Sequence, residues 1–290
     1  MSDAEAGVIT PSHALPSVPL SRDVVEKPLT YWQRLYRLGA LRKTVLLMLL
    51  ALLWELYARQ LANSLLLPTF SETVAAFWSA TASGVLLDRA AVTLQVLVSG
   101  YVIGIALATL LTALAINSRI GADLLETATA MFNPLPAIAL LPLALLWFGL
   151  GNGSLIFVLI HSVLWPVALN THAGFKAVSL TLRMVGKNYG LHGLAYVARI
   201  LIPAAFPAIL SGLKIGWAFA WRTLIAAELV FGVASGSGGL GWFIFENKNQ
   251  LEIPNVFAGL LTVILIGLAV ENLIFRVVET HTVCRWGMHG

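Results

Sequence analysis

A hydrophobic stretch between residues 206 and 231 contains three ionisable side chains, Lys214, Arg222 and Glu228. At 100° per residue on a helix, Lys214 and Glu228 lie about 40° apart, and Arg222 lies about 80° to the other side of Lys214. The three therefore share one broad polar face, which we expect to point into a helical bundle. Ionisable groups within a membrane are costly and mark functional sites. A positive charge at Arg222 would attract a small anion.

These residues also have a structural interpretation. Glu228 can neutralise Arg222 or a group on a neighbouring helix, and we favour this role for Glu228, whereas both interpretations of Arg222 stay open. His161 is either a proton relay or a hydrogen-bonding core residue, and we favour the core role because no paired carboxylates accompany it. We also include Pro136, from a proline-rich stretch. The candidate pathway residues are therefore Arg222, Glu228, Lys214, Pro136 and His161.

Two other acidic residues have simpler expected roles. Glu55 and Arg59 are four residues apart, and we expect them to neutralise each other near the outer end of the first hydrophobic stretch. Glu271 is expected to pair with a neighbour or to face an interface between two copies of the chain.

The composition indicates a bundle of helices in lipid. Of 290 residues, 58% are hydrophobic and only 11% are charged, against about 25% charged in a soluble domain. The net charge of +4 is small and dispersed, so it does not indicate a nucleic-acid partner. The single cysteine, Cys284, excludes an internal disulfide or a thiolate metal site, and we interpret it as an incidental thiol.

Six hydrophobic stretches are long enough to be transmembrane helices. The predicted spans are residues 45–62, 91–116, 125–148, 154–170, 206–231 and 256–277. The third contains Pro134, Pro136 and Pro142, so we expect it to be kinked and packed internally. Between the first two spans, Leu67-Pro68-Thr69 precedes a short, capped amphipathic helix at 72–82, outside the membrane.

The distribution of Lys and Arg predicts that both termini are cytoplasmic. Thirteen fall on the side of the N-terminus and three on the opposite side. The expected organisation is a cytoplasmic tail with an amphipathic segment at 1–43, the first span and outer helix at 44–85, a transmembrane domain at 86–280, and a cytoplasmic tail at 281–290.

One predicted cytoplasmic loop is unlike the others. Between about residues 171 and 203, aliphatic residues recur at helical spacing beside a modest number of charges. A long, structured loop in a protein of short turns usually meets a partner. Gly190 and Gly193 permit a tight backbone turn between two short helices, and Pro203 suits the first turn of the next span.

Several motifs in the chain resemble those of a known family. Gly190, Ile200, Ile202 and Pro203 match the second half of the EAA loop, the cytoplasmic signature of permeases of binding-protein-dependent ABC importers. Between about residues 65 and 280, further segments resemble the nitrate, taurine and sulfonate branch of that family. These segments are Asn133-Pro134-Leu135-Pro136, Leu141-Pro142, residues 146–151, Gly212-Leu213-Lys214, residues 226–229 and residues 238–241.

The resemblance implies an all-α membrane protein, a six-helix type I permease bundle whose loop forms a coupling helix that docks into a groove on an ATPase subunit. The positions of this chain that correspond to the coupling loop are Met184, Val185, Gly186, Gly190, Leu191, His192, Gly193, Ile200, Ile202 and Pro203. The chain departs from the family motif where Glu-Ala-Ala is replaced by Met184, Val185 and Gly186. This replacement removes one acidic side chain and puts one polar docking contact in doubt.

The resemblance also implies partners. Two permease copies, most simply a homodimer, would work with two cytoplasmic ATPase subunits and an external binding protein in a bacterial inner membrane. The chain has no Gly-x4-Gly-Lys-Ser/Thr motif, so ATP and Mg²⁺ are expected on the ATPase, with no cofactor or metal on this chain. We therefore expect a transport subunit rather than an enzyme, which moves taurine, a sulfonate, nitrate or a similar small anion by alternating access.

Two other classes fit less well. An ion-gradient-driven secondary transporter usually shows internal repeats, and residues 45–150 and 154–277 show no similarity to each other. An intramembrane enzyme needs a nucleophile with a base or paired carboxylates, and Asp123 and Glu126 lie at a loop edge without further candidates nearby.

Overall fold

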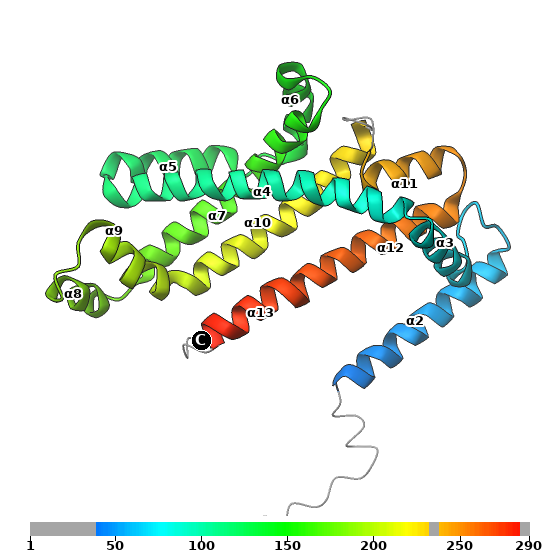
Figure 1. The fold of residues 1–290 in the computed structure, drawn as a ribbon, viewed down its shortest axis with the longest axis horizontal. Helices are drawn as coiled ribbons and strands as arrows, with labels where there is room; N and C mark the ends of the chain where they lie inside the picture. The colour runs from blue at the N-terminus through cyan, green and yellow to red at the C-terminus, as the bar shows by residue number, and fades with distance from the viewer. Residues whose placement is uncertain (1–38, 232–237, 285–290) are drawn as a thin grey trace, which may run out of the picture. The chain divides into compact units, whose positions relative to one another are not determined.

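The computed structural model describes residues 39–231 and 238–284, and it contains helices and no strands within those ranges (Figure 1). The chain divides into two compact units, residues 1–50 and 51–290. The described part of the first unit is the beginning of α2 (Gly39–Leu61). Most of the predicted N-terminal tail at 1–43, which contains the predicted amphipathic segment, therefore lies outside the described residues.

Four helices of the described part are long and apolar enough to cross a membrane. They span Val85–Asn117, Asn152–Ala177, Val197–Val230 and Ile253–Val283. They coincide with the predicted second, fourth, fifth and sixth spans, whereas a count of six spans stays a prediction. The helix α2 coincides with the predicted first span but is not among the four, and it carries Arg42, Lys43, Glu55 and Arg59.

The core of the second unit is formed by α4 (Val85–Asn117), α7 (Asn152–Ala177) and α10 (Ile202–Phe231), with α7 packed against both others (Figure 1). Glycines permit the close approach of α4 and α7. A Cβ atom at Gly100 would lie 2.6 Å from the Cβ of Leu159, and one at Gly104 would lie 2.8 Å from that of Val163. Small residues are typical of helix interfaces in membranes, because backbone proximity maximises van der Waals contact.

The predicted third span is not a single kinked helix. It consists of α5 (Arg119–Phe132), the short helix η1 (Ala137–Leu140) and α6 (Leu141–Phe148), and α5 is bent by 88° from the segment 137–148. The break falls at Pro134 and Pro136, which have no backbone N–H to continue a helix. The prolines therefore break the predicted third span instead of only kinking it. The resulting bent segment lies beside the core.

Two of the long spans contain wide π turns. The helix α10 is continuous with η2 (Val197–Leu201) and α9 (Gly193–Tyr196), and α12 (Ile253–Ala269) continues through η3 (Val270–Phe275), α13 (Arg276–Glu279) and η4 (Thr280–Cys284). The sixth helix thus extends into the predicted C-terminal tail. Pro203 lies in the first turn of α10, as predicted, but η2 and α9 continue the helix upstream of this proline.

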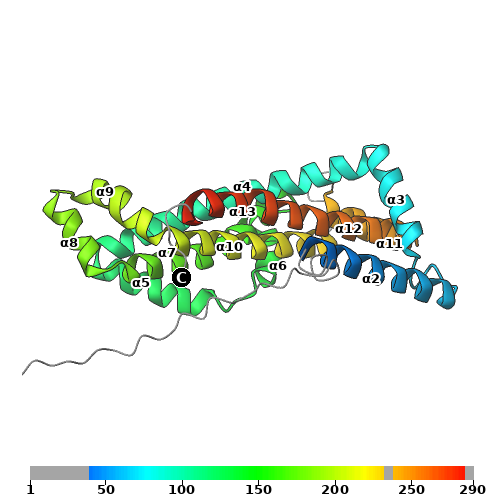
Figure 2. The ribbon, with the colours of Figure 1, turned by 90° about the horizontal axis from the view of Figure 1, so that it is seen from below.

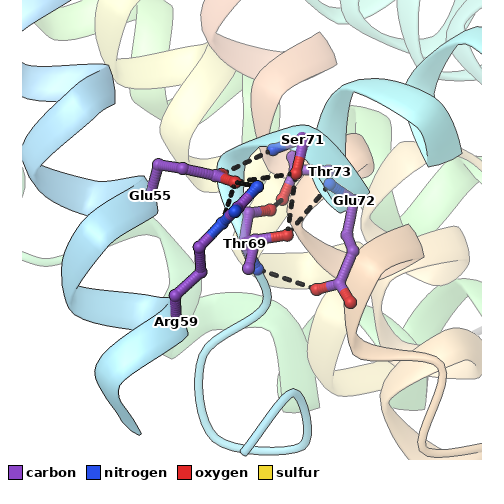
Figure 3. Close-up of polar contacts among 6 residues, drawn as sticks. All are labelled: Glu55, Arg59, Thr69, Ser71, Glu72 and Thr73. Atoms are coloured by element: carbon purple, nitrogen blue, oxygen red, sulfur yellow. Dashed lines mark hydrogen bonds and ion pairs between the residues drawn. The ribbon is translucent and has the colours of Figure 1, made fainter. Parts of the chain in front are cut away.

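The short helix α3 (Phe70–Ala82) confirms the predicted capped helix after the first span (Figure 3). Its cap is Thr69, whose hydroxyl accepts a bond from the Glu72 N–H, while the Glu72 carboxylate accepts one from the Thr69 N–H at 2.8 Å. The expected pair of Glu55 and Arg59 is confirmed at 2.7 Å. Glu55 also accepts bonds from the backbone and hydroxyl of Ser71, so this pair holds the start of α3.

Candidate functional site

A cavity of about 300 Å³ lies beside α7 and α10, closed on one side by the broken segment between α5 and α6. We call it the Arg222 cavity. It brings together three of the five candidate pathway residues, Pro136, His161 and Arg222. Lys214 and Glu228 do not line it. The other lining residues with polar side-chain atoms are Asn133, Ser162, Trp165 and Thr223.

Arg222 supplies the positive charge of this cavity. Its Nε donates to the Ala218 carbonyl at 3.0 Å, and its guanidinium lies 5.3 Å from the centre of the Phe219 ring. These contacts hold the Arg222 side chain against its own helix, α10. They leave its terminal NH₂ groups available to donate hydrogen bonds to a ligand. No acidic side chain of the described residues lies within 4.0 Å of it. Of the two structural roles predicted for Glu228, neutralisation of Arg222 is therefore wrong, whereas contact with a neighbouring helix is confirmed by its bond to Thr93 of α4.

The polar groups on α7 stand beside this charge. Ser162 bonds to Thr223 at 3.2 Å and links α7 to α10. The Nε2 atom of His161 is buried without a hydrogen-bond partner, and its ring lies edge-on to Trp165 at 6.1 Å. The His161 ring also bonds to the backbone of Phe132, so it keeps the predicted hydrogen-bonding role and in addition borders the cavity. A small anion in the cavity would meet a guanidinium, an imidazole and two hydroxyls.

Glu228 has a different environment, buried between α4, α10 and the start of α11 (Leu240–Asn249). Its carboxylate accepts bonds from the Thr93 hydroxyl at 3.1 Å and from the Gly241 N–H at 2.8 Å, and Thr93 in turn accepts from the Leu240 N–H at 2.8 Å. A side chain at Gly239 would collide with Thr93 and Glu228. Glu228 therefore holds the first residues of α11 against α4 and α10, and it does not line the Arg222 cavity.

Lys214 is paired away from the cavity. Its Nζ lies 2.7 Å from Glu279 and 3.9 Å from Glu271, both on the last helix. The expectation that Glu271 pairs with a neighbour is confirmed, and Lys214 joins α10 to that helix. The shared polar face predicted for the three charges thus splits into three separate environments.

The loop that is predicted to be cytoplasmic and to meet a partner folds as α8 (Leu180–Asn188), a turn and α9. Ser179 caps α8 by accepting a bond from the Leu182 N–H. At its end, Gly190 has φ +70° and donates to the Lys187 carbonyl, while the Leu191 N–H donates to the Gly186 carbonyl. This pair of bonds is the Schellman motif, which favours glycine at the left-handed position. The tight turn predicted at Gly190 and Gly193 is confirmed, since Gly193 has φ +55°.

The helix α8 is attached to the bundle by one face. A Cβ atom at Gly186 would lie 2.9 Å from the Tyr196 ring and 3.0 Å from the Ile200 side chain, so α8 packs closely on α9 and η2. Arg183, which the sequence did not single out, donates to the Val178 and Phe175 carbonyls at the end of α7.

The remaining surface of this loop is exposed and partly apolar. Five large apolar side chains of α8 and of the residue that follows it are exposed, and they are Leu180, Leu182, Met184, Val185 and Tyr189. Figure 2 shows α8 and α9 at one end of the helices α4, α7 and α10, and α3 and α11 at the opposite end. Exposed apolar groups on a structured element are typical of a protein–protein contact.

Comparisons with known proteins agree with these features. The family model described as "Binding-protein-dependent transport system inner membrane component" matches residues 100–281. The putative aliphatic sulfonates transport permease protein SsuC of Escherichia coli (strain K12) is 31% identical over 214 residues, 72% of this chain and 80% of that protein.

Two other relatives are named for small anions or for taurine. The nitrate import permease protein NrtB of Synechocystis is 32% identical over 173 residues, 60% of each chain. The taurine transport system permease protein TauC of Escherichia coli (strain K12) is 31% identical over 148 residues, 51% of this chain and 52% of that protein. The resemblance to the nitrate, taurine and sulfonate branch is thereby confirmed. With a family model that covers more than half of its length, this chain belongs to the family of inner membrane components of binding-protein-dependent transport systems.

Proposed function

We propose that this chain forms the translocation pathway of an ATP-driven importer for a small oxyanion, such as a sulfonate, taurine or nitrate. The observation that carries the proposal is the Arg222 guanidinium, which lines a cavity without an acidic partner among the described residues. A guanidinium binds planar or tetrahedral oxyanions through two parallel hydrogen bonds. The relatives named for sulfonates, nitrate and taurine support this class of substrate.

The proposed assembly contains two copies of this chain, two cytoplasmic ATPase subunits that bind ATP and Mg²⁺, and an external binding protein. The chain would cross the bacterial inner membrane six times with both termini in the cytoplasm, and residues 86–280 would form its transport domain. The exposed apolar side chains of α8 would contact the ATPase. The positions of Met184, Val185 and Gly186 support this role, because they lie on α8 itself.

Packing contacts connect α8 to the helix that carries Arg222, and a displacement of α8 would be transmitted along this helix to the proposed anion site. The close contact of Gly186 with Tyr196 and Ile200 ties α8 to the start of a continuous helix that extends from residue 193 to Arg222 and beyond. ATP-driven closure of the ATPase pair would displace α8, and this helix would carry the displacement to the Arg222 cavity. Coupling between sites requires such a packed, rigid element with two arrangements. Alternating access of the cavity to the two sides would follow.

The role of Arg222 is tested by Arg222→Gln in proteoliposomes that contain the whole importer, with uptake of radiolabelled taurine and nitrate as the readout. Loss of a charge-assisted pair worth about 1.5–3 kcal/mol predicts about a 10- to 100-fold lower rate of uptake of the transported anion. The matched control is Lys214→Gln, which removes a cation of the same helix outside the cavity. Normal uptake by an assembled Arg222→Gln complex would remove Arg222 from the pathway.

A further inference from the structure

The face of α7 that lies against α5 carries buried polar atoms without hydrogen bonds. Across residues 39–231 and 238–284, four buried side-chain polar atoms have no hydrogen-bond partner. All four are on these two helices: Thr129 Oγ1, His161 Nε2, Trp165 Nε1 and His172 Nδ1. Buried polar groups are almost always satisfied by protein, water or ligand, because an unsatisfied one costs free energy. This face therefore has the character of a wetted or ligand-lined surface.

Two cavities lie along this face. His161 and Trp165 line the Arg222 cavity, as described above. A second cavity, of about 260 Å³, lies between α5 and α7 nearer the α8 end, and its polar lining consists of Glu126, Thr129, His172 and Lys176. Thr129 is only 8% exposed, so its hydroxyl belongs to the deep part of this second cavity.

An aromatic stack stands between the two cavities. The rings of Phe132 and Trp165 are 5.5 Å apart and nearly parallel, at 14°. On α5, Phe132 follows Thr129 of the second cavity and precedes Asn133 of the first. On α7, Trp165 is followed one turn later by Leu169, which lines the second cavity. The stack therefore occupies the boundary that a solute would cross between them.

We propose that the second cavity is a further binding station for the transported oxyanion, separated from the Arg222 cavity by the Phe132–Trp165 stack. This inference rests on the proposed function. The Lys176 ammonium supplies the charge, and the Thr129 hydroxyl and His172 imidazole supply hydrogen-bond donors within the cavity. A side-chain movement of the stack would connect the two stations, and the substrate would pass from Arg222 toward the end of the bundle that carries α8.

Glu126 is the acidic group that faces this station. Its carboxylate is exposed, and no described basic side chain lies within 4.0 Å of it. A negative charge at the cavity lowers its affinity for an anion without abolishing the attraction of Lys176. Weak binding suits an exit station, because conduction requires a site that a solute can enter and also leave. Lys176 and Glu126 should therefore have opposite effects on anion entry.

The test measures the charge selectivity of thiol labelling in the full chain, held in lipid nanodiscs. In a Cys284→Ser background, Thr129→Cys is treated with methanethiosulfonates that carry either a sulfonate or a trimethylammonium group. The ratio of the two labelling rates reports the potential inside the cavity. Because charged cavities change local ion concentrations by about tenfold or more, Lys176→Gln should lower the sulfonate-to-ammonium ratio about tenfold and Glu126→Gln should raise it.

Two further positions make the result decisive. Leu169→Cys reports on the same cavity if the Thr129 variant does not fold, and the same dependence on Lys176 is expected there. Thr109→Cys lies in a cavity beside α4 whose lining has no charged side chain, and its ratio should not respond to Lys176→Gln.

The proposed station would be overturned if Lys176→Gln left the labelling ratio unchanged at both Thr129→Cys and Leu169→Cys. An absence of labelling at both positions would also overturn it. Labelling requires neither ATP nor transport. If uptake depends on Arg222 but the labelling ratio does not depend on Lys176, the second station is refuted while the proposed function stands.

Discussion

Arg222 and Glu228 are predicted from the sequence to share one polar face of a helix, but the structure gives them different roles. The helical pattern placed both on one polar face, and it did not reveal their partners. Glu228 contacts Thr93, which is 135 residues away in the chain. Arg222 acquires its surroundings from the broken segment near Pro136. Such long-range partners are set by helix packing, which helical periodicity alone does not determine.

The buried bonds of Glu228 lead to a stability prediction. Thr93→Val removes a donor to Glu228 and an acceptor of the Leu240 N–H, and it leaves both groups buried and less satisfied. The expected cost is about 1–3 kcal/mol in free energy of unfolding, which would appear as a lower midpoint of thermal unfolding in detergent. Thr109→Val is the control, because the Thr109 hydroxyl is exposed and bonds only to its own helix. Equal midpoints for the two variants would show that the Thr93–Glu228 contact adds no stability.

At the scale of elements, the sequence predicted the long helices and the turn after α8 well. Long apolar runs identify spans, and Gly190 and Gly193 occupy backbone conformations that favour glycine. The continuity of helix through Pro203 was not predictable from start and stop signals. The wide turn of η2, in which the Ile202 N–H bonds to the Val197 carbonyl, directly precedes this proline. The π turn and the proline thus coexist in one helix.

The break between α5 and α6 was only partly predictable. Three prolines signalled a disturbed span, but a proline can produce either a kink or a full break. The structure shows a bend of 88°, which places Asn133 and Pro136 against α7 and α10. The cavity therefore depends on a bend whose size the prolines alone do not specify.

The apolar surface of α8 gives a prediction about ATPase binding. Leu180 is 76% exposed in the first turn of α8, where an aspartate is favourable for the helix itself. We expect Leu180→Asp to reduce co-purification of the ATPase by about tenfold or more, because it places a charge in an apolar contact. Leu180→Met keeps the apolar contact and should co-purify normally. Unchanged ATPase capture by Leu180→Asp would exclude this surface from the contact.

At the scale of the whole molecule, the family and its transport role were predictable because its motifs are spread along the chain. The chain is a transport component and not an enzyme, as the sequence indicated. It is a multi-pass protein of the inner membrane, with four apolar helices of spanning length in its described part. The number of spans and the orientation stay predictions, because helix geometry contains no reference to the bilayer.

The orientation can be tested in intact cells. With Cys284 replaced by Ser, Ser79→Cys on α3 should react with a membrane-impermeant maleimide added outside, and Thr181→Cys on α8 should react only after the cells are opened. Both positions are exposed, so burial does not decide the outcome. The reverse pattern would place α8 outside and remove its proposed contact with a cytoplasmic ATPase.

The decisive measurement is accumulation of radiolabelled sulfonate, taurine or nitrate in proteoliposomes that contain this chain, its ATPase and its binding protein. We predict accumulation that requires ATP and the binding protein and that persists when ion gradients are collapsed with ionophores. Accumulation without ATP that disappears with the ion gradient would contradict the importer and identify a gradient-driven carrier instead.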